Sequence, residues 1–544
     1  MPSPADPLAE LHAAVAGVAA GLRGSAVELP DLGRPPKAEF GDYSSNAAML
    51  LAPELGSPPR AVAERLGERL GEVLGDRLER IEIAGPGFLN LFVSDRWLRG
   101  SLARIGEAGD QFGSGPAGER ILVEFVSANP TGPITLAAAR HAAYGDSLCR
   151  ILELAGHAVE REYYVNDYGS QVRRFGESLI ARARGEEPPE DGYQGGYVVE
   201  IAARIAGAGA PDADPDQVAT RGVELILNGV RATLERFGVD YDRYFSELSL
   251  HENGAITAAI EALNADQRVY PHEDATWLRT TEFGDDKDRV LQRGSGELTY
   301  FAADIAYHLD KRSRGHERVI NVWGADHHGY IGRMQAAWQA LGGAEGSLEV
   351  IVMQLVNLRD GGAVVQMSKR AGDIVTLDDL LDDIGVDAAR FFLVQRSHDT
   401  TLDLDLALAR EQSQDNPVYY VQYAHARIAS ILRKAGTERV ERALAADLAG
   451  SAEVPHPSAR TLIKRLLAFP GEIALAAERR APHRLTTYAL ETAQDFSAFY
   501  RDCRVVGAAE EGGDEDLRIA LSEHSRRLLE RTLDLLGVAA PSEM

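Results

Sequence analysis

The sequence predicts a multidomain α/β protein, in which an N-terminal α+β domain precedes a parallel sheet of the nucleotide-binding type and an all-helical C-terminal domain. The 544 residues exceed the usual size of one domain. Strand and helix patterns alternate from residue 121 to about 395. Beyond Arg396 only helical periodicity remains. We therefore expect domains at residues 1–110, 120–395 with insertions, and 396–544.

Composition excludes several classes of protein. With 83 acidic and 57 basic residues the net charge is −26, so the surface is not uniformly basic and any contact with nucleic acid must be local. No signal segment and no run of roughly 20 apolar residues is present, which predicts a cytoplasmic protein without a membrane partner. The cysteines, Cys149 and Cys503, have no metal-binding spacing and are expected to be reduced thiols.

The N-terminal domain is expected to combine helices at 8–22 and 59–78 with strands at 81–84 and 85–93. The segment 85–90 begins like a dinucleotide-binding fingerprint. It ends in Asn90 and continues as an alternating strand instead of opening a helix, so we reject dinucleotide binding. A Gly-rich linker at 109–118 leads into the central domain.

The first strand of the central domain, 121–126, runs through 127–133 into a helix at 134–154. A helix that starts at the end of such a strand attracts anions such as a triphosphate, although an ordinary strand–turn–helix has the same pattern. Glu124 lies within the apolar strand. Because an unpaired buried carboxylate is costly, we expect Glu124 to face a ligand.

A second carboxylate follows in the segment 299–308. Tyr300 and Asp304 are spaced i, i+4 and therefore share one face of a helix. Together with Glu124, Asp304 would suit a guanidinium, which pairs bidentately with carboxylates. Sequence spacing alone does not place the two carboxylates together.

Two further polar segments follow apolar strands expected at 318–323 and 348–355. In 324–330, adjacent His327 and His328 cannot both face one site, so a metal site is not expected; one of them, with Asp326, is expected to touch a sugar or base. The loop 366–372 contains a serine and two basic residues, which favours phosphate binding. The alternative is an exposed basic loop without a ligand. The acidic stretches 185–197 and 207–216 are expected to be solvated loops.

Residues 367–370, Met-Ser-Lys-Arg, resemble the KMSKS signature of class I aminoacyl-tRNA synthetases. The segments 123–133, 163–167, 301–311 and 416–427 resemble arginyl-tRNA synthetases in order and spacing. The resemblance implies a Rossmann-like catalytic domain, an N-terminal tRNA-contacting domain and a C-terminal anticodon-binding bundle. It also implies activation of L-arginine by ATP with Mg²⁺, and transfer of arginine to the 2′-hydroxyl of the terminal adenosine of tRNA(Arg). Separately, we expect a monomer.

The resemblance assigns site residues. Arginine is expected at Glu124, Asn129, Tyr300, Asp304 and Asp326. ATP is expected at Gly132, Pro133, Ala138, His327, Met367 and Lys369, with Ser368 and Lys369 stabilising the departing pyrophosphate. Tyr419, Tyr420, Tyr423 and Arg427 fall where the family binds the anticodon stem and loop, and Tyr43 and Asn46 where it binds near the tRNA elbow. From spacing alone the three tyrosines of the C-terminal domain are either stacking surfaces for bases or core aromatics.

One departure from the family pattern affects catalysis. After Pro133 the family has His-x-Gly-His, whereas this chain has Thr135-Leu-Ala-Ala138. Loss of two such donors would slow activation by about 10⁴-fold if their effects added. Three replacements are possible: the Thr135 hydroxyl, the helix N-terminus itself, or His141 with Arg140 nearby; a packed or solvated His141 is the alternative.

Two rival functions remain. One is a catalytically impaired paralogue that binds tRNA or arginine without activating arginine, and only residues 135–138 favour it. The other is a nucleotidyltransferase acting on a small molecule, which leaves the C-terminal domain unexplained.

Overall fold

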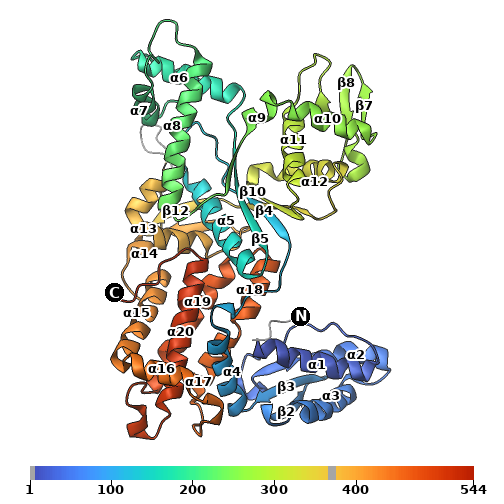
Figure 1. Ribbon diagram of the computed structural model, residues 1–544, viewed down its shortest axis with the longest axis vertical. Coiled ribbons are helices and arrows are strands. Elements are labelled where there is room, and N and C mark those ends of the chain that lie inside the picture. The colour runs from blue at the N-terminus through green and yellow to red at the C-terminus, as the bar shows by residue number, and fades with distance from the viewer. Residues whose placement is uncertain (1–5, 366–374) are drawn as a thin grey trace.

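The computed structural model describes residues 6–365 and 375–544. Figure 1 shows the central domain at one end of the molecule, with the N-terminal domain and the C-terminal helices side by side at the other. Among the described residues, no helix combines the length and the apolar character needed to cross a membrane.

The N-terminal domain is an α+β unit, as predicted. Helices α1 (Pro7–Arg23), α2 (Ala47–Leu55) and α3 (Pro59–Leu74) pack on an antiparallel sheet of β1 (Tyr43–Ser45), β2 (Leu78–Ala84) and β3 (Phe88–Val93), in the order β1-β3-β2. The rejected fingerprint forms the β2–β3 turn, where Gly85 adopts a φ of 53°, a conformation that favours glycine.

Helix α4 (Asp95–Ala108) was not predicted and packs on the C-terminal helices. The two domains also meet at Asp42, whose carboxylate accepts a hydrogen bond from Lys464 Nζ at 2.6 Å and another from Arg460 at 3.0 Å. Beside it, Tyr43 is fully buried. The assignment of Tyr43 to tRNA contact is therefore wrong, because its ring is enclosed by the domain's own core.

The central domain is built on a five-stranded parallel sheet. Its strands are β4 (Arg120–Glu124), β5 (Ala158–Val165), β6 (Arg243–Ser246), β10 (Arg318–Gly324) and β11 (Leu348–Met353), in the order β11-β10-β4-β5-β6. This is the doubly wound arrangement, and its strand order reverses between β4 and β10. Ligands of such sheets bind beyond the strand ends at that switch point.

Helices cover both faces of the sheet. Ile121 and Val123 pack with α5 (Leu136–Leu154) in one core, whereas Leu122 belongs to a second core with α11 (Tyr300–Ser313) and α12 (Ile331–Ala340). Side chains alternate across a strand, so β4 is buried on both sides, which explains its uninterrupted apolar run.

Two insertions rise from opposite sides of the sheet (Figure 1). One contains α6 (Ser170–Ala183), α7 (Gly196–Arg204) and α8 (Pro215–Arg236). Most of the stretch 185–197 is exposed, as expected of a solvated loop, but its end packs on the loop after β4, where the Tyr197 hydroxyl donates to the Thr131 carbonyl at 2.8 Å. The second insertion contains α9 (Glu247–Glu252), α10 (Ala255–Ala265) and an antiparallel sheet of β7 (Val269–His272), β8 (Ala275–Leu278) and β9 (Arg289–Gln292).

The C-terminal part corrects one expectation. Strand β14 (Leu402–Asp405) lies beyond Arg396 and pairs in parallel with β12 (Val356–Asp360), which also pairs with β13 (Ala363–Val365). Its Leu-Asp-Leu-Asp alternation has the period of a strand. Helix α13 (Leu377–Val394) precedes β14. The helices that follow are α14 (Leu406–Arg410), α15 (Pro417–Ala435), α16 (Thr437–Ala445), α17 (Pro457–Leu467), α18 (Phe469–Glu478), α19 (His483–Asp502) and α20 (Glu515–Leu535).

Candidate active site

A cavity of about 400 Å³ lies at the switch point, between the ends of β4 and β10. We call it the switch-point cavity. Six predicted residues line it together, namely Glu124, Asn129, His141, Tyr300, Asp304 and His327. Residues from β4, α5, α11 and the segment after β10 therefore converge at the place where a doubly wound sheet binds its ligand.

Glu124 lies at the floor of this cavity and is 6% exposed. Its carboxylate accepts hydrogen bonds from Lys311 Nζ at 2.5 Å and from the Ser127 hydroxyl at 3.0 Å. Burial raises its pKa, but the Lys311 ammonium and these hydrogen bonds outweigh burial and leave the pKa below its usual value. Lys311 also donates to Asn321 at 2.9 Å. The negative charge of Glu124 is therefore already matched by the protein.

Asp304 has a different environment. Its carboxylate accepts a hydrogen bond from the Tyr330 hydroxyl at 2.5 Å and makes no ion pair with a lysine or arginine in the described part of the chain. Burial raises the pKa of Asp304 to about 6. A buried carboxylate that lacks a matched cation favours binding a positively charged group.

Glu247, which was not predicted, lies beside Asp304. An adjoining cavity of about 390 Å³, the α9 cavity, is lined by Glu247 and shares Tyr164, Asn166, Tyr300 and Asp304 with the switch-point cavity. Burial and then the Asp304 charge raise the pKa of Glu247 to about 7. Its nearest basic group is His251, 3.9 Å away, whose pKa is lowered by burial. Asp304 and Glu247 are thus two neighbouring carboxylates that form no ion pair with a lysine or arginine among residues 6–365 and 375–544.

Local capping places Glu247 in this position. Asp167, in the predicted segment 163–167, accepts a hydrogen bond from the Ser246 hydroxyl at 2.6 Å and from the Leu248 amide at 2.8 Å. These bonds fix the start of α9 at the carboxyl end of β6. The signal that could have identified Glu247 is its position directly after a strand of the parallel sheet, but β6 has only four residues and was not among the predicted strands.

The start of α5 lines a third cavity, the α5 cavity, of about 930 Å³. Asn129, Gly132, Pro133 and Thr135 line one side, and residues 192–197 line another. Thr135 is the N-cap residue, and its side chain makes no capping hydrogen bond, so N–H groups of the first turn are available to a ligand. Ala138 does not line this cavity and packs against the core.

Thr376 forms an antiparallel bridge with Thr135 and also lines the α5 cavity. The chain therefore returns to the start of α5 immediately after residues 366–374. Met367, Ser368 and Lys369, assigned to ATP and to pyrophosphate departure, lie outside the described residues.

The basic residues of α5 differ in role. Arg140 is 1% exposed and donates hydrogen bonds to the carbonyls of Gln354, Ser397 and Thr400. The expectation that Arg140 lies near phosphates is therefore wrong, because its donors are used inside the protein. His141 lines the switch-point cavity and makes no hydrogen bond or ion pair with a described residue. Burial and the Arg140 charge lower its pKa to about 4, so the imidazole is neutral at physiological pH.

In the segment after β10, one predicted residue lines the cavity and another is exposed to solvent. His327 lines the switch-point cavity and its ring lies 6.0 Å from that of Trp323. Asp326 does not line the cavity; its side chain is 80% exposed and lies 3.4 Å from His327. The expected contact of Asp326 with the amino acid is not supported by this position. Within residues 6–365 and 375–544, no group of three or more His, Cys, Asp or Glu side chains could hold a metal ion.

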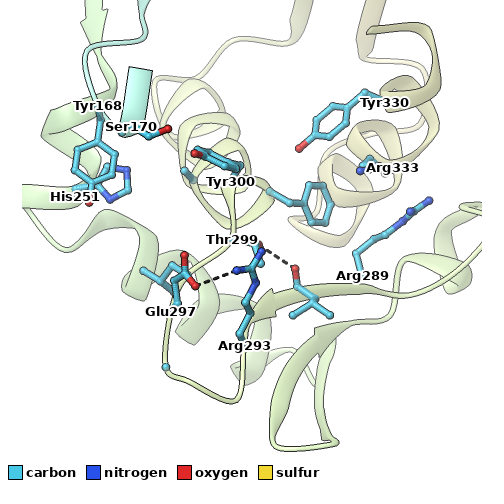
Figure 2. A pocket seen from close by; sticks show the side chains of 16 residues that line it. Tyr168, Ser170, His251, Arg289, Arg293, Glu297, Thr299, Tyr300, Tyr330 and Arg333 are labelled. Carbon is cyan, nitrogen blue, oxygen red and sulfur yellow. Dashed lines mark hydrogen bonds and ion pairs between the residues drawn. The ribbon is translucent and has the colours of Figure 1, made fainter. Parts of the chain in front are cut away.

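A fourth cavity, about 850 Å³ in volume, lies between α11, α12 and the second insertion. We call it the insertion cavity. Figure 2 shows Tyr300 at its centre, with Tyr168 and His251 on one side and Arg289 and Arg333 on the other. None of these residues except Tyr300 was selected from the sequence.

The helical domain presents the predicted aromatic face on α15. Tyr419 and Tyr423 stack with ring centroids 6.4 Å apart, and Tyr423 is 39% exposed. Arg427 is exposed and lies over the ring of Tyr500 at 4.5 Å. Tyr420 instead turns towards α19, where its hydroxyl donates to Ser497. In the N-terminal domain, Asn46 is the N-cap residue of α2 and makes no side-chain capping bond.

Comparison with known proteins gives consistent matches over most of the chain. A family model described as the arginyl-tRNA synthetase N-terminal domain matches residues 9–93, and one described as the DALR anticodon-binding domain matches residues 421–544. The arginine–tRNA ligase of Frankia alni is 48% identical over 524 residues, 94% of each chain. That of Kineococcus radiotolerans is 46% identical, over 94% of this chain and 93% of the relative. The arginyl-tRNA synthetase structure of Thermus thermophilus superposes with a TM-score of 0.79 at 25% identity, covering 99% of this chain and 100% of the other.

Proposed function

The chain belongs to the arginyl-tRNA synthetase family, and from this premise we propose how its residues carry out the reaction. It is an arginine–tRNA ligase of class I. ATP and L-arginine react to give arginyl-adenylate, and the arginyl group is then transferred to the terminal adenosine of tRNA(Arg). Such a reaction depends mainly on positioning and on stabilisation of developing charge.

We assign the guanidinium of the substrate to Asp304 and Glu247. This assignment carries the proposal, because the two carboxylates lie in adjoining cavities and both pKa values are raised, first by burial and then by the charge of a neighbouring carboxylate. A guanidinium can bridge two carboxylates through paired N–H donors. Tyr300 and Asn129 line the same space and orient the remainder of the amino acid.

Glu124 acts from the floor of the cavity as a positioning residue. Its carboxylate holds the Ser127 hydroxyl, which in turn accepts a hydrogen bond from the Tyr164 amide at 3.1 Å. Val126 and Ser127 both have positive φ values, 68° and 42°. The Glu124–Lys311 pair therefore supports a constrained backbone at the point where the substrate must be oriented.

We assign ATP to the α5 cavity, with its phosphates near the first turn of α5. Gly132, Pro133 and Thr135 form that wall, and His327 approaches from the strand-end side. The nucleotide substrate is proposed to be the Mg²⁺ complex, since Mg²⁺ is usually held by substrate phosphates, water and only one or two carboxylates. Lys369 keeps its proposed role in pyrophosphate departure.

His141 is proposed to replace the missing histidines. In the first step an arginine carboxylate oxygen bonds to the α-phosphorus of ATP, and pyrophosphate leaves with the electrons of the broken P–O bond. Negative charge develops on the phosphoryl oxygens, where a neutral imidazole can donate its N–H. His141 is neutral, makes no hydrogen bond or ion pair with a described residue, and faces the cavity proposed to hold the attacking carboxylate. In the second step the adenosine hydroxyl attacks the carbonyl carbon and AMP leaves.

The tRNA-binding surface is assigned to Tyr419, Tyr423 and Arg427 on α15 for the anticodon region, and to Asn46 in the N-terminal domain. The stacked tyrosines offer a platform for an unpaired base, beside an exposed cation for a phosphate. On a chain of net charge −26, these contacts require a local cationic strip, and binding weakens steeply as salt rises.

Arginylation of tRNA(Arg) with labelled arginine, at saturating ATP and Mg²⁺, tests the proposal. The wild-type chain is expected to charge tRNA, and a Lys369→Ala variant is expected to lose charging while still binding arginine. A wild-type chain that binds arginine and tRNA without charging would instead be the impaired paralogue. The presence of both Asp304 and Glu247 at the proposed guanidinium site argues against the impaired paralogue.

A further inference from the structure

Helix α5 connects the active site to the anticodon-binding domain. Thr135, directly before its first turn, lines the α5 cavity, and His141 lines the switch-point cavity. One turn later, the Tyr144 hydroxyl donates a hydrogen bond to the Arg480 carbonyl at 2.6 Å. Arg480 lies within residues 421–544, the part matched by the anticodon-binding family model. One helix therefore carries the groups proposed to stabilise phosphates and is held further along by the anticodon-binding domain (Figure 1).

A second attachment is the guanidinium of Arg390 on α13, whose side chain is fully buried. Its Nη2 donates to the Asp146 carboxylate of α5 at 2.5 Å. Its Nη1 donates to the Phe237 carbonyl at the end of α8 at 3.0 Å, and its Nε to the Leu536 carbonyl at the end of α20 at 2.7 Å. A single planar group thus joins the catalytic domain, the first insertion and the anticodon-binding domain.

Charge and geometry both favour arginine at this position. The carbonyls of Phe237 and Leu536 are at the C-terminal ends of helices, where the helix dipole favours a cation. Asp146 is buried, so its charge requires a cationic partner. A guanidinium donates in several fixed directions, whereas a lysine ammonium is a compact charge on a flexible stem. Lysine in place of Arg390 would therefore keep the charge and lose the geometry.

Asp146 also binds a second guanidinium. Its carboxylate accepts a hydrogen bond from Arg150 Nε at 2.8 Å. Arg150 in turn donates to the carbonyls of Asp534 and Gly238, both at 3.2 Å. Both arginines thus connect Asp146 to the ends of α8 and α20. The position of α5 relative to those two helices is set at one buried carboxylate, which lies five residues after His141.

The backbone that follows α20 lies directly against the Arg390 guanidinium. Gly537 has a φ of 66°, and a Cβ atom added there would lie 2.2 Å from Cζ of Arg390. Because this is far inside contact distance, any side chain at residue 537 must displace the guanidinium or the end of α20. The attachment can therefore be disturbed from the anticodon-binding domain, without changing a residue of the catalytic domain.

We propose that Asp146 and Arg390 are positioning residues for the activation of arginine. They hold α5 in register with the anticodon-binding domain, and through α5 they set where His141 lies relative to the reacting phosphate. The inference rests on the proposed function, which places the phosphates of ATP near the start of α5. The guanidinium site is carried by other elements, since Glu247 lies on α9 and Asp304 on α11.

ATP–pyrophosphate exchange with tRNA present, together with calorimetry of arginine binding, tests this inference. Arg390→Lys is expected to lower the kcat of exchange by about 10- to 100-fold, because a misplacement of about 1 Å can cost about 10²-fold. Arginine affinity is expected to stay at the wild-type value. Arg161→Lys is the matched control, because Arg161 donates to Glu153 of α5 at 2.6 Å from β5, within the catalytic domain. This control is expected to keep the wild-type kcat.

Gly537→Ala tests the same contact from the anticodon-binding domain and leaves every hydrogen-bonding group of the attachment in place. It is expected to lower the kcat of exchange in the same direction as Arg390→Lys, again with arginine affinity unchanged. Gly512→Ala is its control. Gly512 has a φ of 78°, and a Cβ atom added there would have no described atom within 4 Å. The two variants therefore share the backbone penalty, and only Gly537→Ala presses on Arg390.

A double-mutant cycle with His141→Ala distinguishes positioning from general destabilisation. If Arg390 acts through His141, Arg390→Lys should cause a clearly smaller further loss in the His141→Ala background. A general defect of folding would lower kcat by the same factor in both backgrounds. The inference is overturned by equal factors, by loss of arginine affinity in Arg390→Lys, or by Gly537→Ala and Gly512→Ala with the same kcat.

The outcome is separable from that of the proposed function. Wild-type exchange by His141→Ala would refute the role of that imidazole. The positioning inference would then be decided by Gly537→Ala, with Thr135→Ala in place of His141→Ala in the cycle. Slow exchange by His141→Ala, with wild-type exchange by Arg390→Lys and Gly537→Ala, would refute only the positioning inference.

Discussion

The Lys311 ammonium lies 2.5 Å from the Glu124 carboxylate, beneath the cavity assigned to arginine. The Lys311 side chain is fully buried and that of Glu124 is 8% exposed. The pair joins α11 to β4, the two elements that carry most of the predicted arginine-binding residues. Loss of one partner therefore affects both stability and the geometry of the site.

Lys311→Met is expected to destabilise the central domain by about 3 to 5 kcal/mol, because it leaves the Glu124 charge buried without a partner. Without Lys311, burial raises the pKa of Glu124. The loss of stability relative to the wild type should therefore become smaller as the pH falls and Glu124 becomes protonated. Urea unfolding at pH 8 and pH 5 measures both effects. The double variant Glu124→Gln/Lys311→Met should recover most of the loss, whereas exposed Lys37→Met should change little. A double variant as unstable as Lys311→Met would contradict this account.

Arginine affinity is expected to depend on pH through Glu247 and Asp304. Both pKa values are raised in the free protein, to about 7 and about 6, and a bound guanidinium would lower them. Affinity should therefore be full above about pH 8 and fall as the pH drops through 7 and 6, approaching tenfold per pH unit for each carboxylate that must lose a proton. Calorimetry in buffers of different ionisation enthalpy should show proton release on binding near pH 6.5.

The Glu247→Gln variant distinguishes the contributions of the two carboxylates to arginine binding. The variant is expected to bind arginine more weakly and to lose the part of the pH dependence near pH 7, while the part near pH 6 from Asp304 remains. Unchanged affinity with unchanged proton release would remove Glu247 from the site.

Local patterns were sufficient to predict part of this pocket. Tyr300 and Asp304 share a face because a helix brings residues i and i+4 together, and Glu124 was recognisable as a carboxylate in an apolar strand. Lys311 lies seven residues after Asp304 on the same helix and was visible only as part of the family segment. Its contact with Glu124 depends on how α11 packs on β4.

Glu247 could not be predicted in the same way. Its position beside Asp304 depends on the strand order β4-β5-β6 and on the start of α9, which no local pattern contains. Arg140 shows a different limit. Its place beside His141 suggested a basic group near the phosphates, but α5 is buried on most of its surface, and the guanidinium turns to the carbonyls of residues 354, 397 and 400.

Tyr423→Ala is expected to raise the KM for tRNA(Arg) by roughly 5- to 100-fold, the usual effect of losing one base–aromatic stack. The KM for arginine should not change, because Tyr423 lies on α15 and lines none of the four cavities described above. Tyr270→Ala in the second insertion is a matched aromatic control. Arg427→Gln should instead reduce the salt dependence of tRNA binding, by the loss of one phosphate contact. Equal effects of Tyr423→Ala and Tyr270→Ala would contradict the assignment of the α15 face.

The replacement of the missing histidines by His141 makes a prediction specific to this chain. His141→Ala is expected to lower the rate of ATP–pyrophosphate exchange, measured with tRNA present, by about 10²- to 10³-fold, because it removes a donor to the charged phosphoryl group. The KM for arginine should change little. His272→Ala, at an exposed histidine of the second insertion, should have no effect.

Rescue distinguishes this role from a packing role. Ala138 lies three residues before His141 on α5 and therefore on nearly the same helix face. Ala137→Gly/Ala138→His restores the Gly-His half of the family motif, and in the His141→Ala background it is expected to recover much of the exchange rate. Because the pKa of His141 is about 4, wild-type exchange should show no titration of this imidazole between pH 6 and 8. Full activity of His141→Ala would instead assign the charge stabilisation to the α5 N-terminus and Thr135, and Thr135→Ala would then become the variant that loses activity.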